Sequence, residues 1–171
     1  YNTIDFLKLS LYAIKKLTKN DYVVLINDNG SNRNDIDELK KIESDGDAVI
    51  NFRVSQQQTN SAAHGEALDI LISMVDTKYM AILDSDCLPL KKDWDEYLIS
   101  KLNNKVKISG SPLDAHEIFH KPADFPLPFF VMLETETFKN LNISCMPDKL
   151  DFKKDTCYEW RDKYLKNDYK G

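Results

Sequence analysis

Two aspartates, Asp84 and Asp86, directly follow an apolar run in the stretch YMAILDSDCLPL, residues 79–90. On an extended backbone, residues two apart project to the same side, so both carboxylates are expected to point into one crevice. Two hard oxygen donors suit Mg²⁺ or Mn²⁺, which take further oxygens from water and from a diphosphate. The spacing therefore predicts a divalent-cation site that also binds a phosphate ester. An ordinary turn that ends a strand is the alternative for a bare D-x-D.

Polar residues also stand at two other boundaries of apolar runs. Asp28 ends the run DYVVLIND and opens the turn DNGS. His64 and Gly65 end the polar stretch SQQQTNSAAHG, and an apolar helical pattern follows them. An imidazole beside a helix N-terminus suits a phosphate or a sugar, although a histidine before a glycine is equally typical of a plain loop. These three residues are further candidates for ligand contacts.

The residues between these positions alternate between helix and strand patterns. The predicted elements are helices at residues 3–18, 35–42 (with Asn34 as N-cap) and 66–75, and strands at residues 21–28, 48–54 and 78–83. Strands that are apolar on both faces and alternate with helices predict an α/β fold, with a Rossmann-like, mainly parallel sheet between helices. Ligands bind at the carboxyl ends of such strands, which is where Asp28 and Asp84 stand.

Beyond Pro89 the pattern is looser. The expected elements there are helices at residues 93–102 and 157–165 and strands at residues 105–110 and 129–134. The proline-rich connection at residues 111–128 cannot be regular, and it is long enough to have a function of its own. No repeat or linker divides the chain, so residues 1–171 are predicted to form one domain.

The composition argues against several classes of function. Of the 171 residues, 42% are apolar, and 23 basic against 28 acidic residues give a net charge of −5. This balance offers no general attraction to nucleic acid. Three cysteines without a CxxC indicate neither a disulfide framework nor a zinc site, so we expect a cytoplasmic protein. No run approaches the roughly 18 apolar residues of a membrane span, so no transmembrane segment is predicted.

Two stretches, INDNGSNRNDI and HGEALDILISMVDTKYMAILDSDCLPLKKDWDEYL, resemble the family 2 glycosyltransferases with the GT-A fold. In that family a strand ending in D-N-G-S precedes a helix, and a later strand ends in a metal-binding D-x-D. The resemblance covers residues 1–110 and is looser beyond them. It implies a nucleotide-diphospho-sugar donor, a divalent cation (Mn²⁺ or Mg²⁺), and inverting transfer to a hydroxyl of a carbohydrate or another acceptor. Residues 1–110 would bind the nucleotide-sugar, and residues 111–171 would form the acceptor side.

The resemblance also implies roles for individual residues. Asp28 matches the position that contacts the nucleotide base or ribose, while Asp84 and Asp86 match the carboxylates that contact the metal and the ribose. The nucleotide-sugar contacts implied in this way are Tyr1, Asn2, Asp28, Asn29, His64, Gly65, Asp84 and Ser85. The implied metal ligands are Asp84, Asp86 and, because some relatives use a late histidine, His120.

Inverting transfer needs a base that takes the proton of the acceptor hydroxyl. In the family this base is an acid late in the chain, often in an E-D pair before a helix, and Asp155 in FKKDTCYEWRDKYL matches that place. The chain departs from the family because Lys154 precedes it, so Asp151 and Glu159 are the alternatives. Asp155 can also be only the N-cap of the last helix. Trp160 is interpreted mainly as a packing residue, with sugar stacking as a second role.

The first residues, YNT, resemble the turn that closes the opening strand of the family. That strand lies inside the sheet, and its loss would leave backbone groups unpaired and an apolar slot open. We therefore expect a further apolar strand of roughly five to eight residues, upstream of these 171 residues or supplied by another part of the assembly. The prediction is wrong if the strand of residues 22–27 has partners on both sides within this chain.

Two alternatives to a glycosyltransferase remain. A haloacid-dehalogenase-like phosphatase uses the first aspartate of a D-x-D as its nucleophile, a role that would fall to Asp84, although that motif normally opens the domain and here it lies mid-chain. A non-catalytic module that retains the nucleotide-sugar pocket is the second alternative. A nucleotidyltransferase would need a glycine-rich, basic signature near its start, which this sequence lacks.

Overall fold

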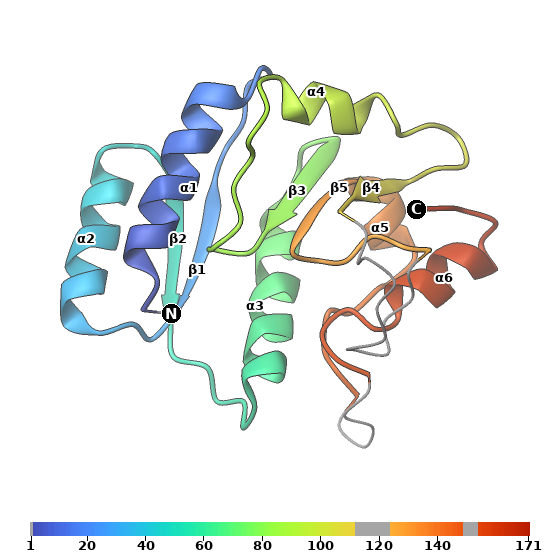
Figure 1. Cartoon of the computed structure of the whole chain (residues 1–171). Coiled ribbons are helices and arrows are strands. Elements are labelled where there is room, and N and C mark those ends of the chain that lie inside the picture. Colours follow the sequence, from blue (N-terminus) through green and yellow to red (C-terminus); the bar gives the residue numbers. More distant parts are fainter. Residues whose placement is uncertain (1, 112–123, 149–153) are drawn as a thin grey trace.

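The computed structural model describes residues 2–111, 124–148 and 154–171. Its elements in chain order are α1 Ile4–Leu17, β1 Leu25–Asn29, α2 Arg33–Ser44, β2 Val49–Arg53, α3 Asn60–Met74, β3 Tyr79–Leu83, α4 Trp94–Ile99, β4 Ile108–Gly110, β5 Phe130–Glu134, α5 Thr135–Asn140 and α6 Trp160–Lys166. Figure 1 shows helices arranged around two groups of strands, so the predicted α/β fold class is confirmed.

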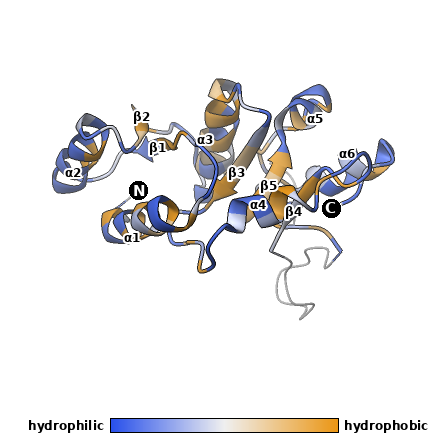
Figure 2. Cartoon of the chain, turned by 90° about the horizontal axis from the view of Figure 1, so that it is seen from above, coloured by the Kyte–Doolittle hydropathy of each residue, from blue (hydrophilic) through white to orange (hydrophobic). Residues whose placement is uncertain are grey.

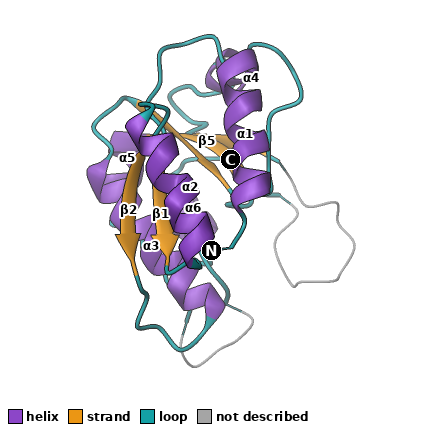
Figure 3. Cartoon of the chain, turned by 90° about the vertical axis from the view of Figure 1, so that its left-hand side faces the viewer, coloured by secondary structure: helices purple, strands orange, loops and turns teal. Residues whose placement is uncertain are grey.

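The strands form two small sheets. β1 and β2 are parallel neighbours, and Figure 3 shows them side by side and pointing the same way. β3, β5 and β4 form a three-stranded sheet in that order, in which both pairs are antiparallel. The prediction of a mainly parallel sheet is therefore wrong for the described residues. Apolar runs reveal where strands lie but not their direction, and two of the three observed pairs run opposite to the predicted sense.

One edge of β1 and one edge of β3 have no strand partner within the described residues. β1 pairs only with β2, and β3 pairs only with β5. Asn2 and Thr3 lie between the ends of these two strands: the backbone N–H of Asn2 donates to Ser31 Oγ (2.9 Å), and Thr3 Oγ1 donates to Ser85 Oγ (3.1 Å). The observation that would have refuted a further strand is thus not met, and that strand stays a prediction.

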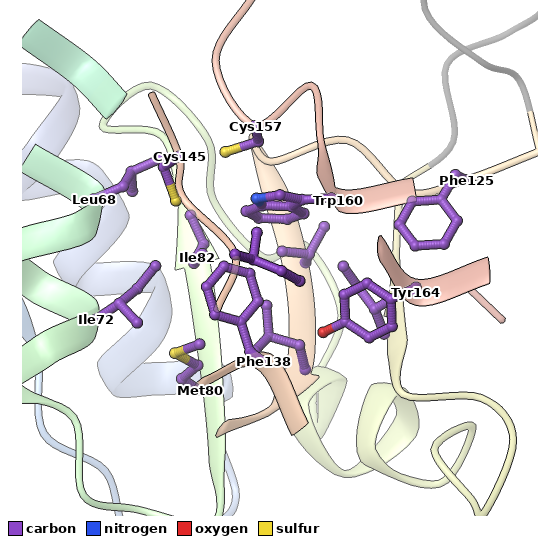
Figure 4. Close-up of a cluster of buried hydrophobic side chains, with 14 residues drawn as sticks. Leu68, Ile72, Met80, Ile82, Phe125, Phe138, Cys145, Cys157, Trp160 and Tyr164 are labelled. Carbon is purple, nitrogen blue, oxygen red and sulfur yellow. The ribbon is translucent and has the colours of Figure 1, made fainter. Parts of the chain in front are cut away.

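The hydrophobic core is divided in the same way as the sheets. The larger cluster joins α3, β3, β4, β5, α5 and α6, and Figure 2 shows hydrophobic residues along the three strands of this part. Trp160 lies inside it at 2% exposure, edge-on to Phe138 with ring centroids 5.3 Å apart (Figure 4). Packing is therefore the role of Trp160, and stacking on a sugar is ruled out by its burial. The smaller cluster joins α2 to β2 and is covered by α1 and β1.

Several helices begin at residues other than those predicted. α2 is capped by Asn32, whose side chain accepts from the backbone N–H of Asp35, so the prediction of Asn34 as the cap is wrong. α3 begins at Asn60, six residues early, with Thr59 as its cap. Residues 60–65, NSAAHG, contain no large apolar side chain, which hides this part of the helix from an analysis of apolar spacing. None of the helices in the described segments combines the length and apolarity needed to cross a membrane.

Candidate active site

Asp28 is the next-to-last residue of β1, and its side chain closes the turn that follows the strand. Its carboxylate is 4% exposed and accepts from the backbone N–H of Gly30 (3.1 Å), the backbone N–H of Ser31 (3.1 Å) and the Ser31 hydroxyl. Gly30 takes a positive φ of 84°, which suits glycine in such a turn. The N–H of Ser31 also lies 3.2 Å from the second carboxylate oxygen, so each oxygen of Asp28 accepts two hydrogen bonds from this turn. The structure therefore contains the turn, and a ligand contact by Asp28 stays a prediction.

A small cavity brings the end of β1 next to the residue after Asp84. Its polar lining consists of Thr3, Asn27, Asp28, Ser31, Asp35 and Ser85, and apolar side chains of α1, β1 and α2 form the rest. The free volume is about 60 Å³, far below the roughly 300–1,000 Å³ of sites that enclose a drug-sized ligand. Only part of a nucleotide fits here in this conformation.

Asp84 lies next to an imidazole from α3. The distance from His64 Nε2 to Asp84 Oδ1 is 3.4 Å, and both side chains are partly exposed, at 40% and 35%. Asn29 supports the same helix, because its side-chain amide donates to the carbonyl of Ala63 (3.2 Å). The structure therefore brings together the end of β1, the second turn of α3 and the residue after β3, as the positions of Asp28, His64 and Asp84 predicted.

The backbone at the acidic motif is a turn and not an extended strand. The N–H of Cys87 donates to the carbonyl of Asp84 (2.9 Å), and Asp86 is exposed within this turn. The expectation that the two carboxylates align as on an extended strand is thus wrong. Burial, and then the negative charges of Asp84 and Asp86, raise the pKa of the Cys87 thiol that follows this turn. The turn, not strand pleating, sets the direction of the two carboxylates.

The chemistry of these donors fits a cation that is shared with a ligand. Among the described residues, no group of three or more His, Cys, Asp or Glu side chains is arranged to hold a metal ion. Asp84 and Asp86 offer two hard carboxylates, and Mg²⁺ or Mn²⁺ commonly completes its shell with water and phosphate oxygens. A cation bound here would therefore depend on oxygens from a diphosphate. His120, the third predicted ligand, lies outside the described residues.

His64 and Gly65 lie in the second turn of α3. The prediction that they precede this helix is therefore wrong. Gly65 is buried, and a Cβ atom there would lie 2.4 Å from the carbonyl oxygen of Cys145. The glycine is thus needed for close packing of α3 on the segment that contains Cys145. A ligand contact by Gly65 stays a prediction.

The remaining N-terminal candidate in the described part is Asn2. Its backbone has a φ of 53°, and its side-chain oxygen accepts from the backbone N–H (2.9 Å) and the amide (3.0 Å) of Asn32. Asn2 therefore stabilises the start of α2 beside the cavity. Tyr1 lies outside the described residues.

Asp155 precedes a turn at the other end of the chain. Its Oδ1 accepts from the backbone N–H of Thr156 (2.7 Å), and α6 begins only at Trp160 with Glu159 at the cap position. Asp155 is therefore not the N-cap of α6. Thr156 Oγ1 donates to the carbonyl of Ser61 (3.1 Å) in the first turn of α3. This bond places Asp155 at the N-terminal end of α3, where His64 also lies.

The two alternatives to Asp155 differ in their positions. Glu159 is paired with Lys163 on α6 (2.6 Å), and Asp151 lies outside the described residues.

Sequence reasoning missed Thr3 and Thr156, whose hydroxyls join distant segments. Only their adjacency to Asn2 and Asp155 could have drawn attention to them.

Comparison with known proteins identifies the family of the chain. A family profile described as Glycosyl transferase family 2 matches residues 1–128. None of the curated proteins compared with the chain matches it. The structure is similar to the mannosyltransferase PcManGT from Pyrobaculum calidifontis in complex with GDP-Man and Mn²⁺, with a TM-score of 0.70 and 13% identity over 99% of this chain and 51% of that one. It is also similar to S. aureus TarS, with a TM-score of 0.59 and 16% identity over 96% of this chain and 32% of that one.

These solved structures extend well beyond the chain, which spans about half of PcManGT and a third of TarS. At such low identities the likeness shows the fold alone, and that fold is the GT-A fold predicted from the acidic motif and the D-N-G-S turn. The profile match covers three quarters of the chain, including every candidate residue of the donor site that the structure describes. The chain belongs to glycosyl transferase family 2.

Proposed function

We propose that this chain transfers a sugar from a nucleotide-diphospho-sugar donor to an acceptor hydroxyl, with inversion at the anomeric carbon. The observation that carries the proposal is the meeting of Asp28, His64 and Asp84 at one end of the fold in a member of this family. The PcManGT complex contains GDP-Man and Mn²⁺, so GDP-mannose with Mn²⁺ is one donor to test.

The donor side of the proposal consists of residues 1–110. Asp84 and Asp86 would hold a divalent cation, which would supply positive charge to the diphosphate leaving group. The hydroxyls of Thr3 and Ser85 line the same cavity as Asp28, where they can donate to or accept from a nucleoside. His64 can donate a hydrogen bond to a phosphate oxygen beside Asp84.

The acceptor side of the proposal consists of residues 111–171, with Asp155 as the base. Inversion requires the acceptor oxygen to attack the anomeric carbon from the face opposite the diphosphate. The base must therefore stand across the site from the acidic motif. The bond from the backbone of Thr156 fixes one oxygen of Asp155, and the contact of Thr156 with Ser61 holds this residue at the start of α3. We infer that Asp155 accepts the hydroxyl proton from this position.

The test is the release of nucleoside diphosphate by the intact protein from UDP-glucose, UDP-N-acetylglucosamine, UDP-galactose and GDP-mannose, each with Mn²⁺. The proposal predicts release from at least one donor. Donor binding without release would favour the non-catalytic module. Hydrolysis of p-nitrophenyl phosphate without release would favour the phosphatase, an alternative that family membership makes the weaker one.

We also propose that a further β-strand lies between β1 and β3, from a segment outside residues 1–171 or from another chain. Two observations support it: within residues 2–111, 124–148 and 154–171 one edge of β1 and one edge of β3 have no strand partner, and partly buried apolar residues of α1 and β1 lie beside the cavity. Hydrogen exchange of the intact protein tests this proposal. A strand there protects the β1 amides that point away from β2, whereas fast exchange of those amides would refute it.

A further inference from the structure

One face of α3 is in direct contact with the segments before α6. Ser61, Gly65 and Asp69 are spaced four residues apart, so they share a face of the helix. The Asp69 carboxylate accepts from the Ser144 hydroxyl (2.9 Å) and from the backbone N–H of Cys145 (2.7 Å). One turn earlier, Gly65 leaves no room for a side chain against Cys145. This face of α3 therefore holds the backbone at residues 144–145 in one place.

The same face continues to the residue after Asp155. Thr156 is 7% exposed, and its hydroxyl donates to the carbonyl of Ser61. Next to it, the backbone N–H of Cys157 donates to the carbonyl of Cys145 (3.0 Å), and Cys157 takes a positive φ of 64°. Thr156 thus stands between the helix and the carboxylate of Asp155, whose Oδ1 accepts from the backbone N–H of Thr156 (2.7 Å) and lies 3.4 Å from its hydroxyl.

α3 also carries His64, whose imidazole faces Asp84 on a neighbouring side of the helix. The helix thus connects the acidic motif with the turn that holds Asp155. We propose that Thr156 is a positioning residue: its buried hydroxyl, bonded to Ser61, fixes the Asp155 carboxylate at the distance from the donor site that proton removal requires. This inference rests on the proposed function, because it takes Asp155 as the base.

The first test compares Thr156→Val, which keeps the shape and removes the hydroxyl, with Thr156→Ser, which keeps the hydroxyl. The readout is nucleoside diphosphate release by the intact protein with Mn²⁺ and whichever of the four donors it uses. We expect Thr156→Val to lower kcat about five- to tenfold, the effect of one net hydrogen bond, with the donor KM unchanged within about twofold. Thr156→Ser should restore most of kcat. Equal loss in both variants, or a change in KM alone, would overturn the inference.

Thr135→Val is the matched control, because Thr135 is also a buried threonine (5% exposed) and its hydroxyl has no hydrogen-bond partner among the residues that the structure describes. It should leave kcat unchanged. Thr156→Ala replaces Thr156→Val if the latter does not fold. If Thr135→Val lowers kcat as much as Thr156→Val does, the loss does not depend on the bond to Ser61, and the inference fails.

A double-mutant cycle with Asp155→Asn tests separately whether Asp155 is the base and whether Thr156 acts through it. If Thr156 acts through Asp155, Thr156→Val causes no further loss of kcat in the Asp155→Asn background. Independent, multiplicative losses would overturn the inference and leave the proposed base intact. Wild-type activity of Asp155→Asn alone would overturn the choice of base in the proposed function.

Discussion

Replacing Gly65 with alanine should destabilise the protein, although alanine is the better helix former. A Cβ atom at this position would lie 2.4 Å from the Cys145 carbonyl oxygen and 2.9 Å from both the Cys145 carbonyl carbon and Met146 Cα. All three are backbone atoms that cannot rotate away. Since real Cβ atoms essentially never come closer than 3.0 Å, α3 or the segment at residues 145–146 must move by at least about 0.6 Å.

The magnitude follows from two opposing effects. Exchanging glycine for alanine inside a helix contributes about 1 kcal/mol of stability. Overpacking a tight contact costs typically about 1–3 kcal/mol, and the shift also strains the hydrogen bonds of Asp69 with Ser144 and Cys145. The two effects together give a loss of about 0–2 kcal/mol, and strain in the Asp69 hydrogen bonds adds to it, so we expect a net loss of about 1–2 kcal/mol in the free energy of unfolding.

Urea denaturation of Gly65→Ala, compared with wild type at equal m-value, measures this loss. Ser73→Ala is the control, because Ser73 is exposed on the same helix and meets no such contact. That variant should be as stable as wild type or slightly more so. If Gly65→Ala is equally stable, α3 does not pack directly on residues 145–146 and the reasoning is refuted.

Three further predictions follow from single contacts. Asn32→Ala should lower the free energy of unfolding by about 1 kcal/mol in denaturant titrations, because it removes the cap of α2, whereas Asn34→Ala should have little effect. Asp155→Asn should retain donor binding by calorimetry but lower the transfer rate by about two to four powers of ten, and full activity would exclude it as the base. Although burial opposes it, hydrogen bonding to Lys107 holds the pKa of Glu134 below its usual value. The stability from Glu134 is thus present above about pH 4.3, the unfolded-state pKa, and lost as pH falls through the lower folded-state pKa; Glu134→Gln should flatten the acid limb of a stability–pH curve.

Local patterns in the sequence were sufficient for much of the donor half. The three-to-four spacing in residues 4–17 identified α1, and apolar runs identified β2, β3 and β5 close to their observed bounds. The convergence of Asp28 and Asp84 followed from a general rule about where strands end. These features depend on short stretches of the chain, which is why the sequence alone predicts them.

Features that depend on distant segments were not predictable in this way. The antiparallel pairing of β5 with β3 and β4 is set by tertiary contacts that an apolar run does not reveal. The turn at Asp84 depends on a single bond from Cys87, and the bond from Thr156 to Ser61 joins residues 95 positions apart. The first turn of α3 was missed because it contains no large apolar residue and its cap, Thr59, lies within a polar stretch.

We propose above that Asp84 and Asp86 hold a divalent cation that binds together with a nucleoside diphosphate. Calorimetric titration of UDP and GDP into the intact protein, with Mn²⁺ and with EDTA, tests it most directly. We expect Mn²⁺ to raise the affinity for one of the two nucleotides by at least about tenfold, because neither the two carboxylates nor the diphosphate alone completes the coordination shell. The Asp84→Asn/Asp86→Asn double variant should show no such increase. If Mn²⁺ raises the affinity equally in that variant, the assignment of the acidic motif is wrong.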